Sequence, residues 1–355
     1  MDKETKRVVT VMMILLAIGV GFAISKIVKA NKELSVEVKT EADRTRYIGA
    51  NGMSFYSMVD TPNAIYTLID TEGDTDAYKI AKAVYAIDKQ TGKMEMVPGS
   101  RKMKYGYDGI DSTFGNEHYL GWIEADTDYT TRTVIYDIEQ EKIIKKLNDS
   151  DTQSFFGAKV VDHTLYWMES DPRLADDSPS IMKSYNLKTS TEKEIDKINT
   201  GGTVFAFSDK KMWYKNEGML KTYDLISGKH EIYNLGVDFN DLKPANDHLV
   251  AYFKYQNESM EYLYLYDTNL RKSVLLSDKD PDMKATFNGK GRIVSDFISY
   301  NITEIDSVKY DKTIQKEYPD NARFSTDEQI DSLLFITDLG EHEEIILMDD
   351  EALGW

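Results

Sequence analysis

A short pattern recurs at nearly regular intervals along this chain. In each copy, a run of alternating apolar and polar residues ends in an aspartate or asparagine that usually follows a tyrosine. The seven copies of this residue are Asp88, Asp137, Asn186, Asp224, Asp267, Asp311 and Asp338, at intervals of 49, 49, 38, 43, 44 and 27 residues. Such spacing is typical of blade-type or solenoid repeats, whose units bury their apolar faces against their neighbours.

The residues around each copy predict a β-hairpin. In Val84–Met96 two alternating runs flank Asp88 and a turn that contains Thr-Gly-Lys. An aspartate side chain can accept hydrogen bonds from backbone N–H groups shortly after it, and glycine supplies the positive φ of a tight turn. A lysine lies five residues after the repeated position in five copies, at Lys93, Lys142, Lys229, Lys272 and Lys316. Gly92 and Gly228 immediately precede two of these lysines.

A second pattern lies upstream of the four middle hairpins and repeats with matching spacing. It consists of an apolar residue and an aromatic residue two positions later, at Leu120/Trp122, Leu165/Trp167, Met212/Tyr214 and Val250/Tyr252. The aromatic residues could form a sugar-binding platform. Their repetition at one strand position instead favours packing in the wedge between neighbouring twisted sheets.

The two patterns together predict an all-β fold. Four antiparallel strands in about 45 residues is the blade of a β-propeller, and 23 tyrosines with many Val, Ile and Thr suit half-buried strands. We therefore expect a propeller of about seven four-stranded blades over residues 47–350. Six blades with an appended hairpin is the alternative. Because the last unit is short, a strand from Val36 to Ile48 could pair into it and close the ring.

The N-terminus predicts a membrane anchor. The run from Val8 to Ser25 is uncharged, and a helix of that length spans roughly 27 Å, enough to cross the hydrocarbon core of a bilayer. We expect a short cytoplasmic tail at 1–7, a transmembrane signal anchor at 8–28 and a stalk at 29–46. The propeller would then lie outside the cytoplasm.

Two alternatives remain open for this segment. It could be a cleaved signal peptide, since Lys3, Lys6 and Arg7 form a positive start and Ala23-Ile24-Ser25 is an acceptable cleavage site. A buried helix of a soluble core is the other alternative, although an unbroken uncharged run at the N-terminus rarely serves that purpose.

Composition excludes several functions. The formal net charge of −18 argues against nucleic-acid partners and against peripheral binding to anionic lipid. The chain has no cysteine, which excludes disulfides, zinc–thiolate sites and a cysteine nucleophile.

Three of the five histidines occupy one repeat position. His118, His163 and His248 each follow an acidic residue and precede the aromatic strand. Equivalent positions lie on a ring in a propeller, so three imidazoles could converge on a metal. Because Lys210 takes this place in the fourth unit, we favour a local turn instead. We predict no metal ligands, no cofactor and no catalytic residues, and we assign no ligand-binding residues.

Acidic residues gather in several predicted loops, at Asp70–Asp76, Asp126 and Asp128, Asp149 and Asp151, Asp176 and Asp177, and Asp278–Asp282. The last cluster begins like an EF-hand loop. Met283 stands where that loop needs glycine, and Gly289 stands where it needs glutamate. We interpret all five clusters as solvated loops between strands.

The segment Tyr85-Ala86-Ile87-Asp88-Lys89-Gln90-Thr91-Gly92-Lys93 resembles the quinoprotein-type repeat Y-A-x-D-x-x-T-G-K, with Met94–Met96 where that repeat ends in tryptophan. As an array, the chain resembles the bacterial TolB-like and quinoprotein-like, BamB-like propellers. Quinoprotein dehydrogenases imply a bound quinone and calcium, often with a vicinal disulfide. This sequence has neither cysteines nor a recognisable set of calcium ligands. The BamB-like branch implies noncatalytic protein binding.

We therefore expect a membrane-anchored, extracytoplasmic propeller that binds or scaffolds an envelope protein or cell-wall polymer. Its partner would meet the rim where the longest loops gather, such as Ser170–Ser180. The alternative is a carbohydrate- or lactone-processing enzyme with its site at the central channel.

Overall fold

The computed structural model describes residues 34–41, 44–70, 83–101, 109–125, 131–147, 154–170, 179–199, 205–255, 261–277, 286–288, 292–295, 298–301, 309–311, 323–324, 333–338 and 343–348. The chain divides into two units, Met1–Ser35 and Val36–Trp355. The expected tail and anchor lie outside the described residues, as does the first part of the expected stalk. Among the residues that are described, no helix is long and apolar enough to cross a membrane.

The unit Val36–Trp355 is built from antiparallel sheets that we number as blades. Blade 1 contains β3 (Ser54–Asp60), β4 (Ala64–Asp70), β5 (Val84–Asp88) and β6 (Met94–Met96). Blade 2 contains β7 (Gly109–Gly115), β8 (Tyr119–Ala125), β9 (Thr131–Asp137) and β10 (Lys142–Leu147). Blade 3 contains β11 (Ser154–Val161), β12 (Thr164–Ser170), β13 (Ser180–Asn186) and β14 (Thr191–Ile198).

The remaining blades complete the ring. Blade 4 contains β15 (Phe205–Phe207), β16 (Lys211–Asn216), β17 (Met219–Asp224) and β18 (His230–Tyr233). Blade 5 contains β19 (Asn240–Pro244), β20 (Leu249–Tyr255), β21 (Glu261–Asp267) and β22 (Lys272–Ser277). Blade 6 contains β23 (Thr286–Asn288), β24 (Arg292–Ser295), β25 (Ile298–Asn301) and β26 (Lys309–Asp311). Blade 7 contains β1 (Glu37–Thr40), β2 (Arg44–Ile48), β27 (Arg323–Phe324), β28 (Leu333–Asp338) and β29 (Glu343–Met348).

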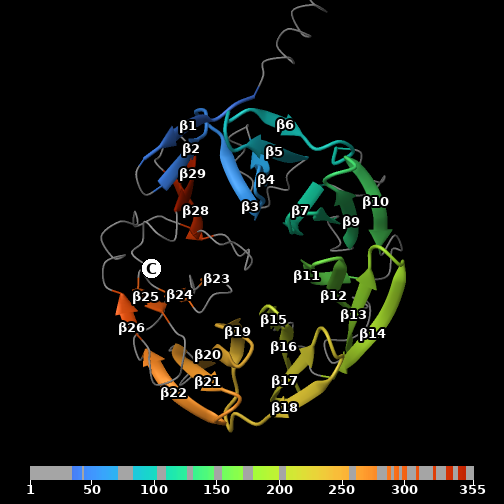
Figure 1. Ribbon diagram of the computed structural model, residues 1–355, viewed down its shortest axis with the longest axis vertical. Helices are drawn as coiled ribbons and strands as arrows, with labels where there is room; N and C mark the ends of the chain where they lie inside the picture. Colours follow the sequence, from blue (N-terminus) through green and yellow to red (C-terminus); the bar gives the residue numbers. More distant parts are fainter. Residues whose placement is uncertain are drawn as a thin grey trace, which may run out of the picture. The chain divides into compact units, whose positions relative to one another are not determined.

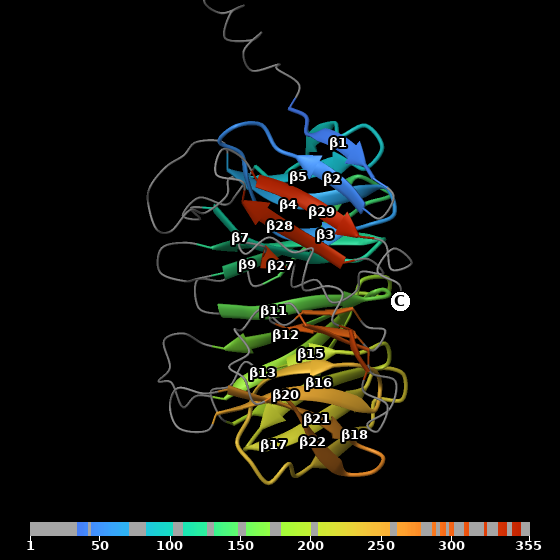
Figure 2. The same cartoon turned by 90° about the vertical axis from the view of Figure 1, so that its left-hand side faces the viewer.

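The described residues thus form six four-stranded sheets and one five-stranded sheet, arranged around a centre as in a β-propeller (Figure 1). The expected all-β propeller is confirmed. In blades 1 to 6 the strands follow one another across the sheet in chain order. The first strands β3, β7, β11 and β15 lie nearest the centre, and the fourth strands lie on the rim (Figures 1 and 2).

The antiparallel order gives the propeller two different faces. In blades 1 to 6, the connections from first to second strand and from third to fourth strand lie at one end of the blade. We call this end the turn face, and we call these connections the inner and the outer turn. The connections from second to third strand lie at the other end, which we call the loop face.

The N-terminal strands close the ring. β2 pairs antiparallel with β29 from Arg44↔Met348 to Ile48↔Glu344, and β1 adds a further strand outside β2. The prediction that Val36–Ile48 closes the ring is confirmed, with two strands in place of one. The predicted stalk of residues 29–46 is wrong in its second half, because the propeller unit begins at Val36 and not at 47.

The first repeated pattern is confirmed in five of its seven copies. Asp88, Asp137, Asn186, Asp224 and Asp267 each end the third strand of a blade. The last two copies differ, because Asp311 ends the fourth strand β26 and Asp338 ends β28, which pairs with β29. The sequence alignment of these last two units was therefore out of register with the strands.

The second repeated pattern builds the core between blades. Its first residue always pairs with the tyrosine of the following strand, as Leu120↔Tyr136, Leu165↔Tyr185, Met212↔Tyr223 and Val250↔Tyr266. Its aromatic side chains are buried. Trp122 shares a buried cluster with Val59 of blade 1, and Trp167 shares one with Ile135 of blade 2. The prediction of packing between blades is confirmed.

Candidate functional site

The outer turns of blades 1 to 5 share one construction. The side-chain oxygen Oδ1 of the repeated Asp or Asn accepts hydrogen bonds from backbone N–H groups two or three residues later. The fourth residue after it always has positive φ, at Gly92 (68°), Glu141 (48°), Ser190 (56°), Gly228 (70°) and Arg271 (51°). The predicted turn, with its aspartate bonded to its own backbone, is confirmed.

In this construction the side chain of the repeated Asp or Asn bonds to the backbone of its own turn. The residues that follow it form the tip of the turn. The hydroxyl and N–H of Thr91 lower the pKa of Asp88, and the N–H and hydroxyl of Ser227 lower the pKa of Asp224. These carboxylates are therefore ionised structural groups, and the chemistry of each tip is decided by the side chains that follow them.

The inner turns contain the three repeated histidines. The backbone N–H groups of His118 and His248 donate to the side chains of Asn116 and Asn246, both at 2.9 Å. The carbonyl groups of His118, His163, Lys210 and His248 each accept an N–H from the outer turn of the same blade. The repeated histidines therefore lie in a turn, but the shared bonds use their backbone groups and not their side chains, which is why Lys210 fits the same position. In the described part of the chain, no group of three or more His, Asp or Glu side chains is placed to hold a metal.

Two of these histidines meet across a blade boundary. The rings of His118 and His163 stack with centroids 5.3 Å apart, and His163 Nδ1 lies 3.1 Å from the Tyr119 hydroxyl. Partial burial and the nearby charges of Lys188 and His118 lower the pKa of His163. Of the three repeated histidines whose convergence was the alternative, these two meet, because the angle between blades 2 and 3 brings their rings together.

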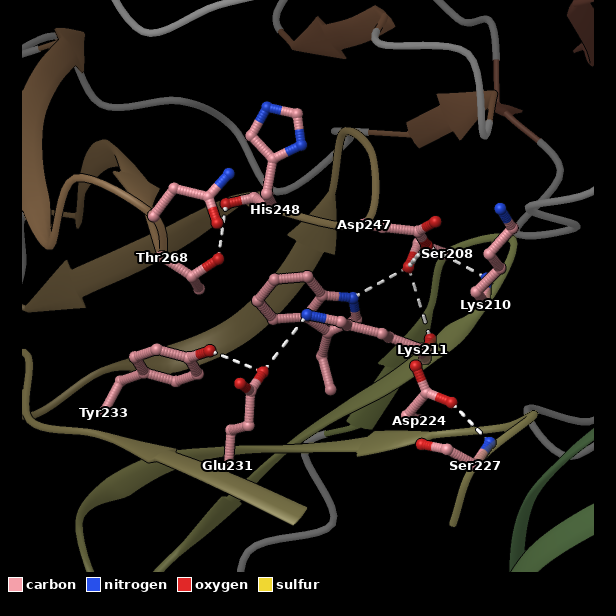
Figure 3. Close-up of polar contacts among 12 residues, drawn as sticks. Ser208, Lys210, Lys211, Asp224, Ser227, Glu231, Tyr233, Asp247, His248 and Thr268 are labelled. Carbon is pink, nitrogen blue, oxygen red and sulfur yellow. Dashed lines mark hydrogen bonds and ion pairs between the residues drawn. The ribbon is translucent and has the colours of Figure 1, made fainter. Parts of the chain in front are cut away.

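Hydrogen bonds also connect the inner turns of neighbouring blades. Between blades 2 and 3, the Asn116 side-chain amide donates to the Asp162 carbonyl at 2.8 Å. Between blades 4 and 5, Asp247 Oδ1 accepts from the Ser208 hydroxyl at 2.8 Å and from the Lys210 N–H at 2.9 Å (Figure 3). The buried indole of Trp213 donates to the same Ser208 hydroxyl at 3.0 Å. These links hold adjacent blades together at the turn face.

A polar chain runs beside this link from blade 4 to blade 5. Lys211 Nζ lies 3.2 Å from Glu231, whose carboxylate also accepts the Tyr233 hydroxyl at 2.8 Å (Figure 3). Arg271, at the outer turn of blade 5, lies over the Tyr233 ring, 6.0 Å from its centroid. Burial and the neighbouring Glu231 carboxylate raise the pKa of Tyr233 to about 12, so its hydroxyl stays protonated and donates.

The third and fourth blades are joined closer to the rim. Asp196, near the end of β14, accepts the Tyr214 hydroxyl at 2.9 Å and pairs with Lys221 at 3.0 Å. Burial opposes ionisation of Asp196, but the hydrogen bonds from Lys221 and Tyr214 outweigh it and lower its pKa. The pair is therefore charged, and it fixes the outer strand of blade 3 against blade 4.

The tips of two outer turns expose large aliphatic side chains. Ile226 in blade 4 is 79% exposed, and Leu270 in blade 5 is 61% exposed. The exposed cations Lys229 and Arg271 follow them in the same turns. We call Ile226 and Leu270 the tip pair. Sequence reasoning missed this feature, although an aliphatic residue within a polar turn was a signal for it.

The predicted acidic clusters and most of the Ser170–Ser180 loop lie outside the described residues. The clusters 70–76, 126–128 and 176–177 connect second and third strands, whose joined ends lie at the loop face. The clusters 149–151 and 278–282 connect the fourth strand of one blade to the first strand of the next. In the antiparallel order, these connections also leave from the loop face. None of the five clusters lies in an inner or outer turn of the blades to which the described strands belong.

No family model matches this chain, and no curated protein matches it. Among solved structures, a prolyl endopeptidase is similar with a TM-score of 0.54 and 12% identity, over 81% of this chain and 46% of the other. An oligogalacturonate lyase in complex with manganese has a TM-score of 0.40 and 11% identity, over 90% of this chain and 98% of the other. TolB from Acinetobacter baumannii has a TM-score of 0.41 and 10% identity, over 83% and 79%.

This chain spans about half of the length of the prolyl endopeptidase that it matches. At such low identity, similarity extends to the fold and not to the activity. The chain is a β-propeller, and its resemblance to these proteins is a resemblance of architecture.

Proposed function

We propose that this chain is a membrane-anchored, extracytoplasmic propeller that binds or scaffolds a partner without catalysis. Its partner would be an envelope protein or a cell-wall polymer. The anchor rests on the uncharged run from Val8 to Ser25. The binding role rests on how the repeated polar residues are used.

The observation that carries the proposal is that the repeated polar residues have structural partners. Asp88 and Asp224 close their own turns, Asp247 joins blade 4 to blade 5, and the histidine turns bond to the neighbouring outer turns. A frame fixed in this way is suited to presenting variable loops, which is how many binding domains work. We place the partner at the loop face, where the acidic connections and the Ser170–Ser180 segment emerge.

A direct test uses the full chain solubilised from membranes with mild detergent. Cross-linking before solubilisation should repeatedly recover the same envelope component with the full chain, and recovery should fall when residues 171–178 are replaced by a Gly-Ser segment of equal length. The matched control is a tip replacement in the outer turn of blade 3, Thr189→Gly, which should leave recovery unchanged. Repeated failure to recover any component, together with turnover of a polysaccharide or lactone, would contradict the proposal.

The rival is a carbohydrate- or lactone-processing enzyme. The observation that supports this alternative is the cluster of His118, His163 and the Tyr119 hydroxyl on the turn face. If such an activity is found, His163→Gln should abolish it when the site is this cluster. Activity that survives His163→Gln would place the site elsewhere.

A further inference from the structure

The tip pair is the most exposed aliphatic feature among the described outer turns. Three properties of these two turns act together. The aliphatic side chains Ile226 and Leu270 project from adjacent blades on the same face. The aspartate of each turn bonds its own backbone, while the cations Lys229 and Arg271 are exposed beside the tips.

Exposed aliphatic tips flanked by cations suit the boundary between lipid headgroups and acyl chains. Apolar side chains gain free energy by leaving water, and basic residues are attracted to anionic headgroups. The tips of the other described outer turns lack this combination. Blade 2 has Glu139, Gln140 and Glu141 at its tip, and blade 3 has Lys188, Thr189 and Ser190.

The chain that leads from the proposed anchor joins the propeller at its turn face. The propeller begins at Val36, whose N–H donates to the carbonyl of Gly92 in the outer turn of blade 1. Only residues 26–35 separate Val36 from the uncharged run, and ten residues reach at most about 36 Å when fully extended. A short tether gives a weak membrane contact a high effective concentration.

The distribution of charge favours the same orientation. The net charge of −18 argued against anionic lipid, but the five acidic clusters lie in connections that leave from the loop face. Like charges repel, so an anionic bilayer would disfavour the approach of the loop face.

We propose that the outer turns of blades 4 and 5 dock on the anionic lipid bilayer that holds the anchor, with Ile226 and Leu270 entering the headgroup boundary. The turn face then lies toward the membrane and the loop face points away from it, toward the partner. This inference rests on the proposed membrane anchoring.

The test exploits the absence of cysteine from the chain. A single environment-sensitive fluorophore is attached to Asn269→Cys, beside Leu270, in the full chain reconstituted in vesicles of phosphatidylcholine and phosphatidylglycerol. Vesicles with brominated acyl chains should quench this label. The double change Ile226→Ser and Leu270→Ser should abolish the quenching, as should replacing phosphatidylglycerol with phosphatidylcholine. A label at Glu139→Cys in blade 2 is the matched control and should not be quenched.

The outcomes separate this inference from the proposed anchoring. If the chain floats with vesicles after an alkaline wash but the Asn269 label is not quenched, docking is wrong and anchoring stands. If the alkaline wash abolishes flotation, and if flotation before the wash requires the tip pair, then docking occurs without an anchor. If the chain never floats, both are wrong. Equal quenching at Glu139 overturns the role of the tips. A label that is shielded from aqueous iodide in native membranes, but is not quenched in the brominated vesicles, would mean that a protein covers the tips, which also overturns the proposal.

Discussion

The carboxylate of Asp247 in blade 5 accepts hydrogen bonds from the hydroxyl of Ser208 and the backbone N–H of Lys210 in blade 4. It therefore joins two inner turns that are distant in sequence. We expect Asp247→Ala to lower the free energy of unfolding by about 1–3 kcal/mol, because both donors lose their partner. Urea denaturation measures this, and Asp209→Ala, at an exposed position in the inner turn of blade 4, should change stability by less than about 0.5 kcal/mol. Equal effects of the two changes would contradict the assigned link.

Trp167 belongs to a buried cluster between blades 2 and 3 that also contains Ile123 and Ile135 of the preceding blade. Replacing this buried indole with alanine leaves a cavity, so Trp167→Ala should cost about 3–5 kcal/mol in the free energy of unfolding. Ile232→Ala, on an exposed rim position, is the control and should be nearly neutral. A mild effect of Trp167→Ala would mean that the aromatic residue faces a surface, as a sugar-binding platform would require.

Gly92 and Gly228 allow the closure of the ring to be tested with a matched pair. Both have positive φ, so alanine at either position should destabilise the fold by about 1–2 kcal/mol, because its Cβ is strained in the left-handed region. Only at Gly92 would the new Cβ meet backbone, since it would collide with the carbonyl oxygen of Val36. Gly92→Ala should therefore be more destabilising in thermal melts and should expose the N-terminal strands to protease. Similar melting temperatures for the two variants would argue against Val36 packing on this turn.

His163 predicts a specific pH dependence. Its folded pKa is lowered by burial, Lys188 and His118, so the unfolded chain binds more protons as the pH falls through the unfolded value of about 6.5. This contribution to stability is complete above the unfolded pKa and is lost as the pH falls to and below the folded pKa. His163→Gln should flatten the decline in melting temperature between about pH 7 and pH 5, a range in which His titrates and most carboxylates do not. An unchanged slope would mean that folding does not lower the pKa of His163.

The local chemistry of the sequence was sufficient to predict the hairpins and the packing of the aromatic residues. Asp88 and Gly92 predict their turn directly, because an aspartate suits the observed hydrogen bonds and a glycine suits the positive φ. Glu141, Ser190 and Arg271 adopt the same positive φ without a residue type that signals it. There the turn is imposed by the aspartate or asparagine and by pairing of the flanking strands.

Contacts between blades could not be predicted in the same way. The hydrogen bonds of Asp247 and the stacking of His118 on His163 depend on the angle between sheets, which no single repeat determines. The extra strand β1 was missed because its hairpin to β2 carries no Gly or Asn-Gly turn signal. The last two units were misaligned because an aspartate after a tyrosine or threonine can end any strand.

The functional account depends most on one claim, that the propeller lies outside the cytoplasm and is held by an uncleaved anchor. Since the chain contains no cysteine, Glu194→Cys on the exposed rim of blade 3 provides a unique reactive site. We predict that a membrane-impermeant maleimide labels this variant in intact cells, and that the labelled chain keeps its full length and stays with the membrane after an alkaline wash. Labelling only after lysis, or a labelled chain released by the wash, would contradict the account.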